Sequence, residues 1–351
     1  MYKKILVPLD GSRLSSFSVD HAVELARALN AQLVFFHVRK DFGSTSEGAL
    51  LRSTSPESFN DVAGGKSNAI LAKAESAARA AGVRCQRLDL VHNHPEDAIL
   101  GAASATGADL ILMASHGRRG LKGAMLGSVT QKVLQKSQWP VLIAAIESNL
   151  SHSSEQRAIG VIKNEHRSLS AVVSGLQQMA KVAGNQNVEP NFPLLWGMIY
   201  YIENFPEKLH HPKEEQFLFR LLKLRTHECD AVIDGLQQQH KDGAVEFKKM
   251  RDALEIFEQQ GHSSSKGFIS AVEAFSLAQW QHLEAEEKLI LPTATQFLSE
   301  GDWDEIATAF LENGDPRFGD AAEIPFDELF TKISNLAAEQ EATTTATTKT
   351  Q

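Results

Sequence analysis

Histidines and glutamates recur with metal-ligand spacing in the second half of the chain. Two segments, 210–219 and 282–291, each begin with a histidine that is followed four residues later by a Glu-Glu pair and then by apolar side chains. Residues at i and i+4 lie about one turn apart on the same face of an α-helix, so an imidazole and a carboxylate can point at one ion. The repeat therefore predicts two ligand pairs: His210 with Glu214, and His282 with Glu286.

Two other helical patterns in this half each carry a further histidine, His166 and His240. The whole candidate set is then four imidazoles and two carboxylates: His166, His210, Glu214, His240, His282 and Glu286. Carboxylates that can bridge, with imidazoles as terminal ligands, suit two iron or manganese ions. A single zinc ion would need only three or four ligands.

Each part of this pattern also has an ordinary explanation. One His-x-x-x-Glu pair on a helix is usually a solvated pair, and we expect Glu215 and Glu287 to face solvent. His211 could compete with His210 as a ligand, and the repeat alignment favours His210. The repetition of the pattern, with one histidine on each remaining helix, favours a metal site.

Phosphate-binding features occur in the first half. Asp10 ends the first apolar run, and a segment that contains Gly117 leads to Gly127 and Ser128 at the start of a helical pattern. Glycines let the backbone approach a phosphate, and a helix N-terminus adds N–H donors. Ser128 could also cap this helix. The alternative is that these glycines only form tight turns and that Ser128 only caps.

The elements that position these residues fall into two groups. Five apolar runs alternate with helical patterns within residues 1–147, which predicts an α/β domain with a parallel sheet covered on both faces. These predicted strands are 5–9, 32–38, 83–90, 109–114 and 141–146. Residues 148–157 are polar and are interpreted as a linker.

Long helical patterns without strand signals follow, and they predict an all-α four-helix bundle over residues 158–300. Its helices are expected near 158–183, 191–225, 229–259 and 266–299. Pro206 and Pro212 should kink or break the second helix. Residues 301–337 are expected to form shorter helices and residues 338–351 a disordered tail.

Composition limits the possible functions. The length of 351 residues favours two domains. The formal charge of −9 argues against a nucleic-acid or anionic-membrane binder. No apolar run approaches a membrane span, and the first apolar stretch is too short for a signal peptide. Cys85 and Cys229 lie in separate predicted domains, so we expect no disulfide and a reducing, cytoplasmic environment.

Residues 1–146 resemble the universal stress protein family, including the segments Ser115-His116-Gly117-Arg118 and Pro140-Val141-Leu142-Ile143. ATP-binding members carry Gly-x-x-Gly, nine residues, and then Gly-Ser or Gly-Thr. Here the second glycine and the Gly-Ser pair match, and Ala114 replaces the first glycine. The resemblance implies that ATP or a related adenine nucleotide binds, and that the protein is a homodimer through its last strand. The implied contacts are Asp10 and Val38 at the adenine and ribose, and Gly117, Gly127, Ser128, Val129 and Thr130 around the phosphates.

Residues 158–300 resemble the hemerythrin-like (HHE) cation-binding domain, through Glu165-His166, the segment 210–219 and the segment 282–292. The resemblance implies a non-haem di-iron centre with bridging carboxylates. Oxygen-carrying members use five histidines. The four histidines assigned here are more similar to the iron–sulfur-repair and iron-sensing branches.

Together these features predict a stress-response protein that binds an adenine nucleotide and two iron ions and that senses or buffers O₂, NO, peroxide or iron. The alternative is a di-iron enzyme or an iron donor acting on the same small molecules. No catalytic triad, nucleophile motif or kinase motif is evident in the sequence, which favours binding and sensing over catalysis.

Overall fold

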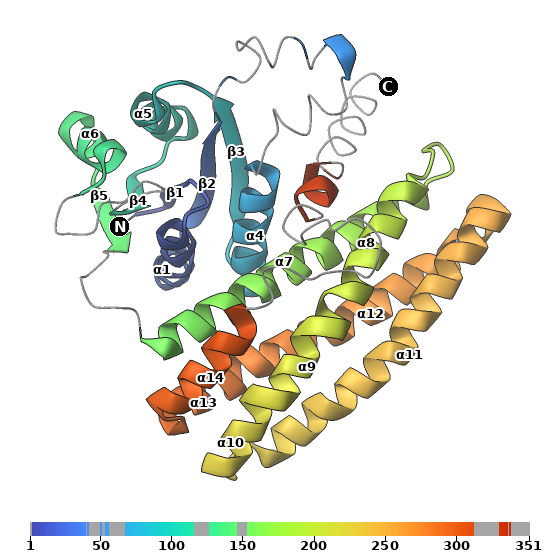
Figure 1. Cartoon of the computed structure of the whole chain (residues 1–351). Coiled ribbons are helices and arrows are strands. Elements are labelled where there is room, and N and C mark those ends of the chain that lie inside the picture. The colour runs from blue at the N-terminus through green and yellow to red at the C-terminus, as the bar shows by residue number, and fades with distance from the viewer. Residues whose placement is uncertain are drawn as a thin grey trace. The chain divides into compact units, whose positions relative to one another are not determined.

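The chain folds into two compact units, Met1–Ser151 and His152–Gln351 (Figure 1). The computed structural model describes the following residues: 2–39, 41, 50, 53–55, 67–115, 126–145, 153–311, 330–335 and 337. Within those residues, none of the helices is both long enough and apolar enough to cross a membrane.

The first unit is built on a five-stranded parallel sheet with the strand order β3-β2-β1-β4-β5. Its strands are β1 (Lys4–Leu9), β2 (Gln32–Arg39), β3 (Cys85–Val91), β4 (Leu110–Ala114) and β5 (Val141–Ala145). The chain runs outward from β1 to β3 and then returns to place β4 beside β1. This reversal creates a switch point at the carboxyl ends of β1 and β4, which is where ligands bind in open α/β sheets.

Helices cover both faces of this sheet, as a parallel sheet with continuous apolar strands requires. Helices α1 (Arg13–Leu29) and α4 (Ser67–Ala80) pack on one face, around buried strand residues such as Val7 and Phe35. Helices α5 (Pro95–Thr106) and α6 (Ser128–Lys136) pack on the other face, around residues such as Phe36. The predicted α/β fold with a parallel sheet is confirmed.

The second unit is entirely helical in its described residues. Its first and third long helices are α7 (Ser154–Ala183) and α11 (Asp230–Gln260). The second consists of α8 (Phe192–Asn204), a π-helical turn η1 (Pro206–His210), α9 (His211–Lys213), a second π-helical turn η2 (Glu214–Phe219) and α10 (Arg220–Arg225). The fourth consists of a 3₁₀ turn η3 (Gly261–Ser264), α12 (Ser265–Ala285), a π-helical turn η4 (Glu286–Ile290) and α13 (Leu291–Phe297). The predicted all-α bundle is confirmed.

Helix α7 begins four residues before the predicted start of the bundle. Ser153 is its N-cap, and the Ser153 side chain accepts a hydrogen bond from the backbone N–H of Gln156. Glu155 adds a negative charge in the first turn, which favours the helix dipole. The end of the segment expected to be a linker is therefore a helix start.

A fifth helix, α14 (Glu300–Leu311), packs along α7. It supplies Trp303, Ile306 and Phe310 to a core shared with the bundle helices. Asp302 receives two hydrogen bonds from the guanidinium of Arg225, each of 2.9 Å, and Ser154 donates its backbone N–H to Glu300. The apolar core, the Arg225–Asp302 ion pair and the Ser154–Glu300 hydrogen bond together hold α14 against the bundle.

Candidate functional site

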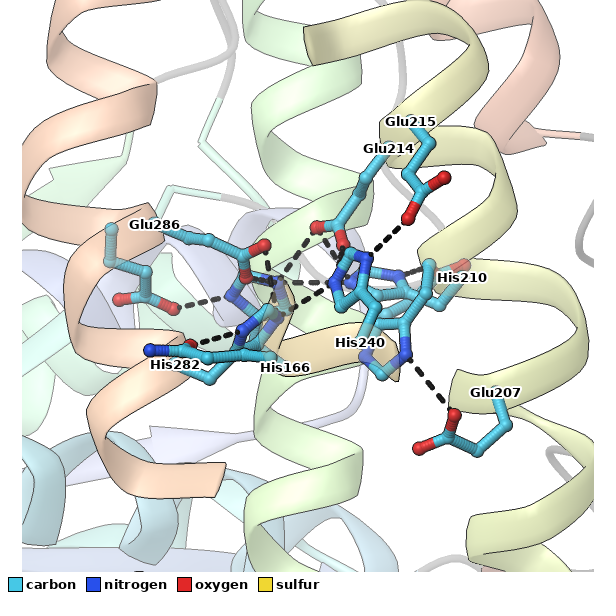
Figure 2. Close-up of polar contacts among 12 residues, drawn as sticks. His166, Glu207, His210, Glu214, Glu215, His240, His282 and Glu286 are labelled. Carbon is cyan, nitrogen blue, oxygen red and sulfur yellow. Dashed lines mark hydrogen bonds and ion pairs between the residues drawn. The ribbon is translucent and has the colours of Figure 1, made fainter. Parts of the chain in front are cut away.

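Two groups of potential metal ligands lie in the middle of the helical bundle (Figure 2). The first position is formed by His166, His210, Glu214 and Glu286, and the second position by His211, Glu214, His240 and His282. In each group the ligand atoms all lie within 4.8 Å of one another. The six residues expected from the sequence are thus brought together, and a seventh, His211, joins them.

The imidazole nitrogens have the separations expected for ligands of one ion. The Nε2 atoms of His166 and His210 are 3.1 Å apart, and those of His240 and His282 are 3.2 Å apart. Two nitrogens at right angles around an ion, each roughly 2.1 Å from it, would be about 3 Å apart. The histidine pairs therefore fit one ion each.

Glu214 and Glu286 lie between the two positions. Glu214 Oε1 is 3.1 Å from His210 Nε2, and its Oε2 faces His240 at 3.7 Å. Glu286 Oε1 is 3.2 Å from His282 Nε2, and its Oε2 is 3.4 Å from His166 Nε2. Each carboxylate thus presents one oxygen to each position, as a bridging ligand does.

These two carboxylates are buried without hydrogen-bond partners. The exposed fraction is 0% for Glu214 and 1% for Glu286, and none of their four side-chain oxygens has a hydrogen bond within the described residues. A buried carboxylate without a partner is costly, and bound cations are one of the few ways to offset that cost. The donor set therefore fits two cations.

Local π-helical turns bring each glutamate into place. Glu214 is the first residue of η2 and Glu286 is the first residue of η4. A π-turn adds one residue to a helical turn and is frequent at functional sites. The sequence repeat indicated the ligand pairs but not this departure from α-helical geometry.

The charges of the cluster are strongly perturbed in the metal-free protein. Burial opposes charge on His166, but the nearby Glu214 carboxylate, a hydrogen bond to Glu287 and the attraction of Glu286 outweigh it and raise the His166 pKa to about 9. Burial likewise opposes ionisation of Glu214, but the charge of His210 and the close approach of the His166 and His210 rings hold the Glu214 pKa well below its usual range. The buried carboxylates therefore favour the protonated form of the His166 and His210 rings.

His210 and His211 were expected to be alternatives for a single ligand position, and this expectation is wrong. His210 and His211 are both buried, with exposed fractions of 2% and 5%. The His211 ring stacks on His240 at a centroid distance of 4.1 Å. It belongs to the second position, whereas His210 belongs to the first. Among the described residues, five histidines rather than four surround the two positions.

The second glutamate of each Glu-Glu pair was expected to face solvent, and this expectation is wrong in part. Glu215 Oε1 accepts from His240 Nδ1 at 2.9 Å, and Glu287 Oε1 accepts from His166 Nδ1 at 3.0 Å. Their side chains remain 40% and 38% exposed. Each reaches from the bundle surface to a histidine on another helix.

In the α/β unit, the described candidate residues gather at the carboxyl ends of β1, β2 and β4. Asp10 follows β1, Val38 lies near the end of β2, and Gly127 follows the β4 end, with its N–H donating to Ser115 O at 2.8 Å. Gly127, rather than Ser128, is the N-cap of α6, and no side chain of the described residues caps this helix. Within that part of the chain, the N-terminus of α6 therefore lies at the switch point without a side-chain acceptor.

The residues after Gly127 differ in exposure. Ser128 is exposed, Val129 is half-buried and Thr130 is buried. The Thr130 hydroxyl donates to Ala114 O at 3.2 Å, which ties the start of α6 to the end of β4. Gly117 lies outside the described residues.

The chain matches two known families. Residues 1–145 match the universal stress protein family, and residues 157–294 match the hemerythrin HHE cation binding domain.

Similar proteins include the universal stress protein YxiE of Bacillus subtilis, which is 36% identical over 147 residues; the match covers 41% of this chain and 99% of that protein. The universal stress protein MJ0577 of Methanocaldococcus jannaschii is 30% identical over 154 residues, covering 41% of this chain and 94% of that protein.

Among solved structures, that of MJ0577 is 28% identical with a TM-score of 0.36, and it covers 42% of this chain and 99% of its own. A universal stress protein in complex with cAMP is 28% identical with a TM-score of 0.31, and it covers 42% of this chain and 98% of its own. The two matched ranges, 1–145 and 157–294, lie one after the other in the same chain. The chain therefore belongs to the universal stress protein family and carries a hemerythrin HHE cation binding domain after its universal stress protein domain.

Proposed function

We propose that the helical unit binds two iron ions. The observation that carries this proposal is the burial of all four oxygens of Glu214 and Glu286 without hydrogen-bond partners, between two groups of histidines. A donor set of imidazoles and bridging carboxylates suits non-haem iron. When bound, iron at such a site supplies redox chemistry with O₂, NO or peroxide.

The residues of the chain would hold the ions as follows. His166 and His210 serve the first position, and His211, His240 and His282 serve the second. Glu214 and Glu286 serve both positions. Every one of these side chains is at most 8% exposed, so ions bound between them would be shielded from bulk water.

We also propose that the α/β unit binds ATP or a related adenine nucleotide at its switch point. The uncapped N-terminus of α6 would accept the phosphates through the N–H groups that follow Gly127. Asp10, which follows the strand beside β4, would contact the adenine and ribose end, as the resemblance to ATP-binding universal stress proteins implies. Val38, Gly117, Ser128, Val129 and Thr130 complete the proposed nucleotide contacts.

Together the two sites support a role in stress protection, in which the protein senses or buffers O₂, NO, peroxide or iron. A binding role differs from an enzymatic role in a measurable way. A sensor reacts with one equivalent of peroxide or NO per metal centre. An enzyme continues to turn over when a reductant is added, and an iron donor loses its iron to an added apo-cluster acceptor. Steady turnover would contradict the sensing role and leave the metal site intact.

The first test is iron content. We expect about two irons per chain in the wild type and the near-ultraviolet absorption typical of ferric iron with carboxylate ligands. A Glu214→Gln/Glu286→Gln double variant should lose both. Glu284→Gln is the matched control, because Glu284 lies on the same helix as His282 but is 59% exposed and pairs with Lys288. Absence of iron in the wild type, or iron that survives the double substitution, would contradict the proposal.

A further inference from the structure

A closed ring of hydrogen bonds surrounds the proposed ligands. Four histidines each donate Nδ1–H to a side-chain oxygen on another long helix. The pairs are Glu165 with His210 at 2.6 Å, Glu215 with His240 at 2.9 Å, Gln239 with His282 at 3.0 Å, and Glu287 with His166 at 3.0 Å. Each long helix thus gives one of these histidines and one acceptor, and the ring closes from the fourth helix back to α7.

The ring orients the histidines. An imidazole that donates from Nδ1 has its lone pair on Nε2, and the Nε2 atoms point into the two positions. An outer carboxylate holds such a ring in place and makes its Nε2 a stronger donor to a metal ion. The acceptors are therefore positioning residues for the ligands.

The ring has an internal two-fold pattern with one exception. His210 and Glu215 on the second helix correspond to His282 and Glu287 on the fourth, with the same spacing of five residues. On the other two helices, the acceptor directly precedes the histidine, as Glu165 on α7 and as Gln239 on α11. Residue 165 is therefore a carboxylate, whereas residue 239, at the equivalent place on α11, is a neutral amide.

Because of this exception, the carboxylates that hydrogen-bond to ligand histidines are divided unequally between the two positions. Both histidines of the first position, His166 and His210, bond to outer carboxylates. Of the second position's histidines, one bonds to a carboxylate and one to the amide of Gln239. The remaining histidine, His211, has the Glu207 carboxylate 3.7 Å from its Nδ1, which is an ion-pair distance but too long for a hydrogen bond.

We propose that residues 165 and 239 set the difference in metal affinity between the two positions: the Glu165 carboxylate strengthens the first, and the neutral Gln239 leaves the second weaker than a carboxylate would. This inference rests on the proposed metal site. Loss of an outer-shell partner of a ligand histidine changes metal affinity by about 10- to 100-fold. Exchanging the two residues should therefore move the ratio of the two dissociation constants by at least about 100-fold.

The test compares wild type, Glu165→Gln, Gln239→Glu and the double exchange. Fe(II) added anaerobically in competition with a chromogenic chelator gives two stepwise dissociation constants. Crystals grown with one Fe(II) per chain then give the occupancy of each position by anomalous scattering. Glu165→Gln should lower occupancy beside His210, Gln239→Glu should raise it beside His282, and the double exchange should combine both changes.

Gln238→Glu is the matched control. It adds the same charge one residue away on α11, where the exposed side chain bonds to Asp242 rather than to a ligand histidine. Gln239 is itself exposed, so its substitution leaves the core intact. The control should leave the occupancy ratio unchanged.

The possible failures are distinguishable. If both positions bind Fe(II) in every variant and the occupancy ratio does not move, the roles assigned to residues 165 and 239 are wrong while the metal site stands. If Gln238→Glu moves the ratio as far as Gln239→Glu, a diffuse charge effect replaces the ring. If the wild type binds no Fe(II), the proposed metal site fails, and this inference fails with it.

Discussion

Metal binding to the helical unit should depend steeply on pH, because metal ions and protons compete for the same nitrogens. The pKa of His166 is raised to about 9, and the pKa values of His210 and His282 are also raised. In each case burial lowers the pKa, and the nearby carboxylates outweigh it. Metal binding near neutral pH must therefore displace protons from these rings.

The size of this effect follows from His166 alone. At pH 7 the ring is about two pH units below its pKa, so its proton reduces the apparent metal affinity by about 100-fold relative to the value above pH 9. His210 and His282 add to the slope, whereas the lowered pKa of His240 removes its proton from the competition. Affinity should rise at least about tenfold per pH unit between pH 6.5 and 8.5.

The assay is anaerobic Fe(II) titration against a chelator of known pH dependence, with proton release measured by calorimetry in buffers of different ionisation enthalpy. A His166→Gln variant should bind more weakly and show a slope reduced by about one proton. An affinity that changes less than about threefold over these two pH units would refute the competition between protons and metal ions.

The same pKa shifts predict how the stability of the metal-free unit varies with pH. A histidine whose pKa is raised on folding stabilises the fold below its unfolded value, and this contribution is lost as pH rises through the folded value. For His166 the loss falls between pH 6.5 and about 9. The lowered pKa of Glu214 acts at the other end, where its stabilisation is lost in acid below pH 4.5. The melting temperature of the metal-free protein, measured by thermal denaturation, should therefore fall between pH 6.5 and pH 9.

Three further substitutions test other parts of the chain. Phe310→Ala should lower the free energy of unfolding of the helical unit by about 3–5 kcal/mol, because the ring is fully buried. Chemical denaturation followed by circular dichroism would measure this change. The control is Leu277→Ala at an exposed position, which should stay within about 0.5 kcal/mol of wild type. Asp10→Ala should weaken binding of a fluorescent ATP analogue by about 10- to 100-fold through the loss of a charged hydrogen bond, and an unchanged dissociation constant would remove Asp10 from the nucleotide site. The family resemblance implies a homodimer through the last strand. Leu142→Lys, on the edge strand β5, should convert that dimer to a monomer in light scattering, and a dimer that survives would exclude this edge as its interface.

The sequence predicts those elements best whose ends carry local signals. Helix α5 has such signals at both ends, since Pro95 begins it and Gly107, with a φ of 67°, ends it. The ligand pairs on the second and fourth long helices were likewise evident from a repeat that needs only spacing to be recognised. In both cases the information lies within one segment of the chain.

The π-helical turns and the ring of acceptors were not predicted, because they depend on packing between segments. An i, i+4 pattern assumes α-helical geometry and does not indicate that Glu214 and Glu286 begin π-turns. Glu165 and Gln239 directly precede histidines, a signal that could have been noticed, but a helix neighbour at i−1 points elsewhere on its own helix. Only the neighbouring helix shows what that side chain reaches.

Helix α14 has a consequence for how this unit could be exchanged between proteins. The Phe310 ring lies edge-on to His210 at a centroid distance of 5.7 Å, and Lys213 donates to the carbonyl of Ala309. The match to the cation-binding family ends at residue 294, before this helix begins. A graft cut at the family boundary would therefore leave behind one wall of the proposed metal site. A transplanted piece should run at least from the Ser153 cap through Leu311, and the Phe330 ring, 6.0 Å from that of Tyr201, packs on the same unit.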